Sequence, residues 1–219
     1  MKHTLYLDSF HLAFKEHTVL NSIYLKCETG KITGLLGRNG SGKSCLMKIA
    51  FGSMRCIHKS IRIDEERLLG DYIHRKLIGY LSQERFIPDS ISMRTVLGLF
   101  RISEGDVLNT FPEWQPLLNH KLGELSGGHA RLFEAMVILL SPHKFCILDE
   151  PFSGLAPLHI DKLKEIVHLQ RESKGIIITD HLHKHVTSLA DDLYLLANGR
   201  SIPVKTPEQL VQLGYLSSL

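Results

Sequence analysis

The 219-residue sequence lacks long hydrophobic runs and an excess of one charge. Its longest apolar stretches are short, as at Met136–Leu140, whereas a membrane-spanning helix needs about 18 or more apolar residues. We therefore expect no membrane span in this chain. Met1–Asp8 reaches an acidic residue before any apolar core can form, so we expect no signal peptide either. Neither absence says what the protein does.

Charge and cysteine content exclude further classes. The 26 basic and 23 acidic residues leave a net charge of +3, too small for the strongly basic face of a nucleic-acid-binding protein. The four cysteines show no C-x-x-C spacing, so we expect reduced, packed thiols rather than a disulfide framework or a zinc site. A hydrophobic content of 43% and a charged content of 22% are typical of an ordered soluble protein.

What is present indicates an α/β fold. The first third of the chain has the composition of strands, and apolar residues from Ser92 to Leu140 fall at helical spacing. Two later apolar runs, Phe145–Leu148 and Gly175–Thr179, are separated by the helix-like stretch Leu158–Gln170. Strands alternating with helices predict a mostly parallel sheet flanked by helices. The length, about one and a half typical domains of roughly 150 residues, favours one domain with a helical insertion.

The strongest motif is a phosphate-binding loop. Gly37–Ser44 matches G-x-x-x-x-G-K-[ST] in full, after a predicted strand and before a predicted helix. Glycines let the backbone curl so that N–H groups face phosphate oxygens, and the helix adds its positive N-terminal end. Lys43 is expected to neutralise the β- and γ-phosphates, and Ser44 to ligate Mg²⁺. The residues of this segment expected to bind nucleotide are Gly37, Asn39, Gly40, Ser41, Gly42, Lys43, Ser44 and Cys45.

A second motif supplies acids. The apolar run Phe145–Leu148 ends in Asp149 and Glu150. Asp149 is expected to hold Mg²⁺, directly or through water, and Glu150 to orient and deprotonate the attacking water. Together the two motifs predict a P-loop nucleotide hydrolase that uses Mg²⁺.

Between these motifs, Leu125–His129 reads Leu-Ser-Gly-Gly-His, which resembles the Leu-Ser-Gly-Gly-Gln signature of ATP-binding cassette (ABC) ATPases. The resemblance extends in family order through essentially all 219 residues. It implies one cassette over residues 1–219, with an N-terminal antiparallel β subdomain and a helical subdomain at about 84–140 that carries the signature. The residues that match the adenine-stacking aromatic, the Q-loop glutamine, the D-loop and the switch histidine are Phe14, Gln83, Ser153–Ala156 and His181.

The resemblance also implies roles. Gln83 would sense the γ-phosphate and contribute to the Mg²⁺ site, and His181 would hydrogen-bond the γ-phosphate as part of the catalytic machinery. The signature residues would contact ATP held by a second subunit, giving a head-to-tail homodimer or heterodimer. These signature residues are Ser126, Gly127, Gly128 and His129. Release of the γ-phosphate would open the dimer.

Two positions depart from the family pattern. His129 replaces the usual glutamine, and Ala156 replaces the usual D-loop aspartate, so coupling between two ATP sites is expected to be weaker. Because both acids and the switch histidine are retained, hydrolysis is still expected. His181, His183 and His185 alternate, but they straddle a strand-to-helix junction where side chains diverge, so a metal site there is not expected.

The family resemblance favours the nucleotide-binding subunit of a membrane transporter, with a separate transmembrane permease subunit as partner and no nucleic acid. The subunit would be cytoplasmic, peripheral on the cytoplasmic face of the inner or plasma membrane. A groove formed by Glu84–Pro88 and the stretch to Phe100, with Phe86 and Ile87 as apolar contacts, would receive the permease. The alternatives are a soluble cassette ATPase outside transport and an ATP-binding regulatory module with little turnover, the latter suggested by Ala156.

Overall fold

The computed structural model describes residues 2–217. Its centre is a six-stranded sheet in the order β11-β10-β4-β9-β8-β7, in which all neighbours are parallel except the β10–β11 hairpin. These strands are β11 (Arg200–Val204), β10 (Asp192–Ala197), β4 (Ile32–Leu36), β9 (Gly175–Thr179), β8 (Phe145–Asp149) and β7 (Ile78–Leu81).

A second, antiparallel sheet forms the N-terminal part. Its strand order is β2-β1-β5-β6, with β3 also paired to β1. Its strands are β1 (Thr4–Phe14), β2 (His17–Leu20), β3 (Tyr24–Glu28), β5 (His58–Ile63) and β6 (Glu66–Arg67). The predicted α/β fold, with a mostly parallel core sheet and an N-terminal antiparallel layer, is confirmed.

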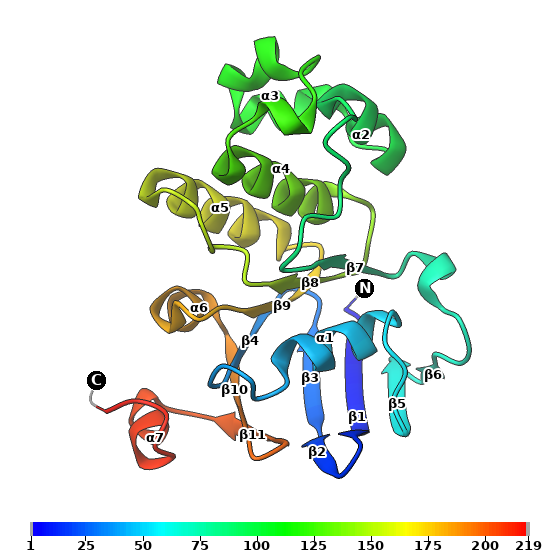
Figure 1. Ribbon diagram of the computed structural model, residues 1–219, viewed down its shortest axis with the longest axis vertical. Helices are drawn as coiled ribbons and strands as arrows, with labels where there is room; N and C mark the ends of the chain where they lie inside the picture. Colours follow the sequence, from blue (N-terminus) through cyan, green and yellow to red (C-terminus); the bar gives the residue numbers. More distant parts are fainter. Residues whose placement is uncertain (1, 218–219) are drawn as a thin grey trace.

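The parallel sheet is buried on both faces because its central strands are apolar on both sides. Along β8, Phe145 and Ile147 belong to one hydrophobic cluster, whereas Cys146 and Leu148 belong to the other. This alternation follows from the two-residue repeat of a strand. Helix α1 (Lys43–Phe51) and strand β3 pack on one face of the sheet. Helices α4 (Gly127–Leu140) and α6 (His183–Leu189) pack on the other face, with α5 (Pro157–Gln170) against α4 (Figure 1). One face is therefore covered largely by the antiparallel sheet and α1 rather than by helices alone.

Most of the helices lie in the second half of the chain. Helices α2 and α3 sit at one end of the molecule, beyond α4, while α7 lies near the opposite end (Figure 1). The helices after α1 are α2 (Met93–Phe100), α3 (Glu104–Thr110), α4 (Gly127–Leu140), α5 (Pro157–Gln170), α6 (His183–Leu189) and α7 (Pro207–Gln212). Short 3₁₀ turns are η1 (Ile73–Arg75), η2 (Pro112–Leu117) and η3 (Leu122–Glu124).

The helical segment is joined to the core by apolar packing. Val107 and Trp114 belong to the same buried cluster as Leu148 and Ile176 of the parallel sheet. Its division as a subdomain at about residues 84–140 of a single domain, residues 1–219, stays a prediction. No helix within residues 2–217 combines the length and apolarity that crossing a bilayer requires.

Close packing between strands at one point of the sheet can be tested. In Gly175→Ala, the added carbon would lie 2.6 Å from Cδ1 of Phe145 and 3.0 Å from Sγ of Cys27, both fully buried. We expect the free energy of unfolding, measured by urea denaturation, to fall by about 1–3 kcal/mol. Combining it with Phe145→Leu should cost less than the sum of the two single changes.

The matched control is Gly98→Ala in α2, where an added carbon meets no atom of the described residues within 4 Å. Alanine is the better helix former, so this variant should be as stable as the wild type or more stable by up to about 1 kcal/mol. A Gly175→Ala protein with wild-type stability would contradict the packing described.

Candidate nucleotide-binding site

The phosphate loop connects the end of β4 to the start of α1. Gly40 has φ 78° and Gly42 has φ 101°, left-handed values that favour glycine, and Gly42 caps α1. Nζ of Lys43 donates to the carbonyl oxygens of Gly37 at 2.8 Å and Arg38 at 3.3 Å. Burial lowers the pKa of Lys43, whereas the nearby Glu150, Asp149 and Asp180 carboxylates act in the opposite direction. A buried ammonium beside exposed helix-start N–H groups is suited to a polyphosphate.

One cavity of about 530 Å³ opens beside this loop. It gathers predicted site residues from four separate parts of the chain: the end of β1, the phosphate loop with α1, the segment after β7 and the segment after β8. The lining residues are Phe14, Val19, Asn39, Gly40, Gly42, Lys43, Ser44, Cys45, Gln83 and Glu150. Phe14 is 53% exposed, which leaves its ring available to stack on a flat ligand.

Asp149 lies beneath the cavity at the end of β8 and is fully buried. Its Oδ2 accepts a hydrogen bond from the Tyr80 hydroxyl at 3.2 Å, and its Oδ1 has no hydrogen-bond partner within residues 2–217. Burial raises the pKa of this carboxyl, opposed by the hydroxyls of Ser44 and Tyr80 and by Lys43. A carboxylate oxygen without a partner, together with the Ser44 hydroxyl and the Gln83 amide oxygen, is an oxygen donor set that fits Mg²⁺.

Glu150 and His181 follow neighbouring strands and lie close together. Nδ1 of His181 is 3.7 Å from Oε2 of Glu150 and 3.3 Å from Oδ1 of Asp180. Glu150 has a φ of 52°, an uncommon value for a residue other than glycine, and its N–H donates to Thr179. This sharp turn directs the Glu150 side chain to the cavity. The rings of His183 and His185 instead contact Tyr215 and Phe152, so the three alternating histidines face different neighbours.

The four signature residues lie at the start of α4, and none of them is among the residues that line this cavity. Ser126 caps the helix: its Oγ accepts the N–H of His129 and lies 2.8 Å from Nδ1 of the same residue. The start of α4 also packs on the segment after β8, where a carbon added to Gly128 would lie 3.2 Å from the Gly154 carbonyl oxygen.

Two buried charged residues of α4 were not predicted from the sequence. The guanidinium of Arg131 donates to the carbonyl oxygens of Ser82 at 2.5 Å and Asp149 at 2.7 Å, and also to that of Glu150 at 3.0 Å. Oε1 of Glu134 accepts the N–H groups of Phe86 at 3.0 Å and Ile87 at 3.1 Å.

These bonds hold both sides of the Gln83 segment against α4. Burial lowers the pKa of Arg131, and the Glu134 carboxylate opposes this shift. Burial raises the pKa of Glu134, opposed by the Ile87 and Phe86 N–H groups and by the charge of Arg131. The sequence signal for this pair was available: Arg131 and Glu134 are charged residues inside an otherwise apolar helical stripe.

Asp180 was also missed. It is buried, and its two carboxylate oxygens accept the N–H groups of Leu182 at 2.8 Å and Phe152 at 3.0 Å. It thereby ties the segment after β9 to the segment after β8, which carry His181 and Glu150. Like Asp149, it comes at the end of a mostly apolar run of residues, and that position in the sequence could have identified it as a site residue.

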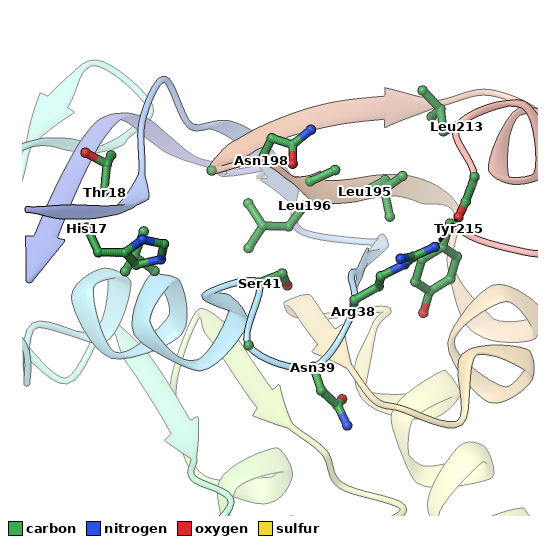
Figure 2. Close-up of a pocket in the computed structure, with 15 residues that line it drawn as sticks. His17, Thr18, Arg38, Asn39, Ser41, Leu195, Leu196, Asn198, Leu213 and Tyr215 are labelled. Carbon is green, nitrogen blue, oxygen red and sulfur yellow. Dashed lines mark hydrogen bonds between the residues drawn. The ribbon is translucent and has the colours of Figure 1, made fainter.

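A second cavity, of about 540 Å³, shares Val19, Asn39 and Gly40 with the first and extends to β10 and the C-terminal segment (Figure 2). Ser41 lines this cavity and not the first one. Figure 2 shows Arg38 extending toward Tyr215, and its guanidinium donates to the Gly214 carbonyl oxygen at 2.7 Å. The C-terminal segment therefore contacts the phosphate loop directly.

The prediction that Ile87 faces a partner is wrong. Its side chain is buried, 6% exposed, because Glu134 draws the backbone of this segment toward α4. Phe86 is half-buried and packs against Phe100 with ring centroids 6.1 Å apart. The groove in this region is instead lined by the end of α2, at Leu99–Arg101, together with residues of α1, η1 and the segment before β8.

The parallel core sheet and the glycine-rich loop before α1 define a P-loop nucleotide-binding protein. A family model described as "ABC transporter" matches residues 20–153, more than half of the chain. The chain therefore belongs to the ABC transporter family.

Relatives agree with this assignment. The chain is 30% identical to the lipopolysaccharide export system ATP-binding protein LptB of Escherichia coli K12, over 95% of this chain and 93% of the relative. It is also 30% identical to the high-affinity branched-chain amino acid transport ATP-binding protein BraG of Pseudomonas aeruginosa, over 84% of each. A solved structure described as an ATP-binding subunit of an ABC transporter has the same fold, with a TM-score of 0.84 at 24% identity over 96% of this chain and 93% of that one.

The Arg131 contacts yield a stability test. Arg131→Met would leave three carbonyl oxygens of the Gln83 and Glu150 segments without their donor. We expect the free energy of unfolding to fall by about 2–4 kcal/mol, measured by urea denaturation. The matched control is Arg94→Met, which removes a half-exposed partner of Glu104 and should cost less than about 1 kcal/mol. Equal losses in the two variants would contradict the role assigned to Arg131.

Proposed function

We propose that this protein is the ATP-binding and ATP-hydrolysing subunit of a membrane transporter. The observation that carries the proposal is the single cavity in which Phe14, the phosphate loop, Gln83 and Glu150 meet. The relatives named as ATP-binding proteins of transport systems support the same role.

In this proposal Phe14 stacks on the adenine, and the phosphate loop binds the triphosphate. The segment Gly37–Ser44 directs N–H groups to the phosphates, and Lys43 moves from the Gly37 and Arg38 carbonyl oxygens to the β- and γ-phosphates. Cys45 continues the first turn of α1 beside the same cavity. Ser44, Gln83 and Asp149 would hold Mg²⁺, whose chemistry when bound is neutralisation of phosphate charge.

Glu150 is the group proposed to accept the proton of the attacking water. Its turn at the end of β8 aims the carboxylate into the cavity, and His181, 3.7 Å away, would donate a hydrogen bond to the γ-phosphate. The buried Asp180 beside His181 fixes the two segments relative to each other.

The signature residues act in a second subunit in this proposal. Ser126–His129 starts a 14-residue helix whose first N–H groups are available to an anion, yet the segment does not line its own chain's cavity. A head-to-tail dimer, of two identical or two different subunits, would place it against the γ-phosphate held by the other phosphate loop.

The proposed membrane partner is a separate permease subunit that brings this chain to the cytoplasmic face of the inner or plasma membrane. A groove of about 340 Å³ beside α2 suits a short apolar segment of such a partner. Leu99 is 67% exposed and lies beside Phe100 and Phe51 in this groove. Exposed leucine beside aromatic side chains is typical of interaction sites. The transported substrate would be set by the permease.

The second candidate function is an ATP-binding module with little turnover. The observation that favours it is Ala156, which caps α5 without a side-chain hydrogen bond where the family pattern has aspartate. Steady-state hydrolysis of ATP distinguishes the two candidates.

Replacing the proposed base tests the reaction. Glu150→Gln keeps the size of the side chain but removes its basicity, so ATP turnover should fall by a factor of about 10²–10⁴ while ATP binding is retained. Turnover is measured as phosphate release with the membrane partner present, and binding by fluorescence of a nucleotide analogue. The matched control, Glu165→Gln on the exposed side of α5, should hydrolyse at the wild-type rate. Unchanged turnover in Glu150→Gln would overturn the assignment of the base.

The docking groove is tested separately. Leu99→Asp places a charge in the apolar groove, so co-purification with the permease in detergent should be lost while ATP binding stays normal. The control is Leu169→Asp on α5, an equally accessible leucine at 62% exposure outside this groove. Recovery of the permease with Leu99→Asp in wild-type yield contradicts this groove as the docking site.

A further inference from the structure

The hydrogen bond between Ser126 and His129 brings a titratable ring into contact with the proposed γ-phosphate ligand. Ser126 Oγ and His129 Nδ1 are 2.8 Å apart, and the hydroxyl oxygen also accepts the backbone N–H of His129 at 3.3 Å. Ser126 is exposed, whereas His129 is half-buried. A serine hydroxyl can donate only one hydrogen bond, so the imidazole competes with any anion for that hydrogen.

The direction of this bond depends on the protonation and the tautomer of the ring: the imidazolium can only donate from Nδ1, whereas the neutral ring can also accept there. When Nδ1 carries a proton, it donates to Ser126 Oγ, and the hydroxyl hydrogen is free to be donated to a phosphate oxygen. When Nδ1 is bare, the hydroxyl donates to Nδ1 instead, and its hydrogen is no longer available. The protonated ring also adds a positive charge next to the anion site.

The charged and titratable groups near His129 lie on neighbouring elements. The His159 ring on α5 lies edge-on to it at 4.7 Å between centroids. Burial, His129 and Lys162 lower the pKa of His159, opposed by Glu113 of η2. Lys162 and Glu113 form an ion pair with each other at 2.7 Å.

We propose that His129 is a positioning residue for the signature serine: protonation at Nδ1 turns the Ser126 hydroxyl outward, toward the γ-phosphate of ATP bound by a second subunit. The inference rests on the head-to-tail dimer of the proposed function. It gives the histidine that replaces the usual glutamine a defined effect, namely ATP-driven dimerisation that depends on pH.

The sign of the effect follows from linkage. Because the protonated ring is favoured in the ATP-bound dimer, dimer formation raises the pKa of His129. The resulting stabilisation is complete below the pKa of the free subunit and is lost as the pH rises through the pKa of the dimer. ATP should therefore drive dimerisation better in mildly acidic than in mildly alkaline solution.

The test uses the full chain carrying Glu150→Gln, so that ATP is not consumed, with dimerisation followed by light scattering during ATP titration. With His129, the ATP concentration for half-maximal dimerisation should rise at least about threefold between about pH 6 and about pH 8. With His129→Gln, whose amide donates at every pH, the rise should be much smaller. This comparison removes the contribution from titration of the nucleotide itself.

Two further variants separate positioning from structure. His129→Leu neither donates to the serine nor accepts its hydrogen, so it should require more ATP than the His129 protein at about pH 6 and should lose the pH dependence. His168→Gln on the exposed face of α5 is the control and should keep the pH dependence of the parent. In the nucleotide-free subunit, Ser126→Ala should change the pKa of His129 measured by NMR, because the hydrogen bond is absent.

The outcomes are distinct. Equal pH dependence in the His129 and His129→Gln proteins would overturn the role of His129 and leave the proposed dimer intact. An NMR pKa of His129 that is unchanged by Ser126→Ala would likewise overturn it. Absence of ATP-driven dimerisation in every variant would overturn both the dimer and the inference that rests on it.

Discussion

The parallel pairing of β4, β9, β8 and β7 is the constraint on which the site depends. In register, Leu148 pairs with Ile178 and Asp149 with Thr179, so the strands end at the same edge. The phosphate loop, Gln83, Glu150 and His181 each follow one of these strands. Segments far apart in sequence therefore meet at this edge. In open α/β sheets, ligands bind at the same place, outside the carboxyl ends of the strands.

The sheet edge that carries Gln83 and Glu150 is tied to the helical end of the molecule through α4. Arg131 donates to carbonyl oxygens on both the Gln83 and the Glu150 segments, and Glu134 accepts from the backbone beyond Gln83. Buried charged groups are costly to leave unpaired, so this connection is rigid as long as all partners stay in place. A shift of α4, which begins with the signature serine, would therefore move Gln83 with it.

The departures from the family pattern lie on one surface. Ser126 and His129 start α4, Ala156 caps α5, and the His129 ring meets His159 of α5. The carbon that would be added at Gly128 approaches the Gly154 carbonyl oxygen, so the start of α4 contacts the segment just before α5. A change in the protonation of one histidine here acts on the surface proposed to face the other subunit.

The sequence by itself determined the phosphate loop, the acids Asp149 and Glu150 at the end of β8, the strand–helix alternation and the order of the family motifs, because these depend on local spacing. It did not indicate β10 and β11, although Asn198 and Gly199, with φ of 50° and 72°, form the kind of turn that joins hairpin strands. Tertiary structure alone decided that Ile87 is buried, which backbone groups Arg131 and Asp180 bind, and that His129 contacts Ser126 and His159. Those outcomes depend on which buried polar groups form hydrogen bonds between distant segments, and residue spacing along the chain does not specify those partners.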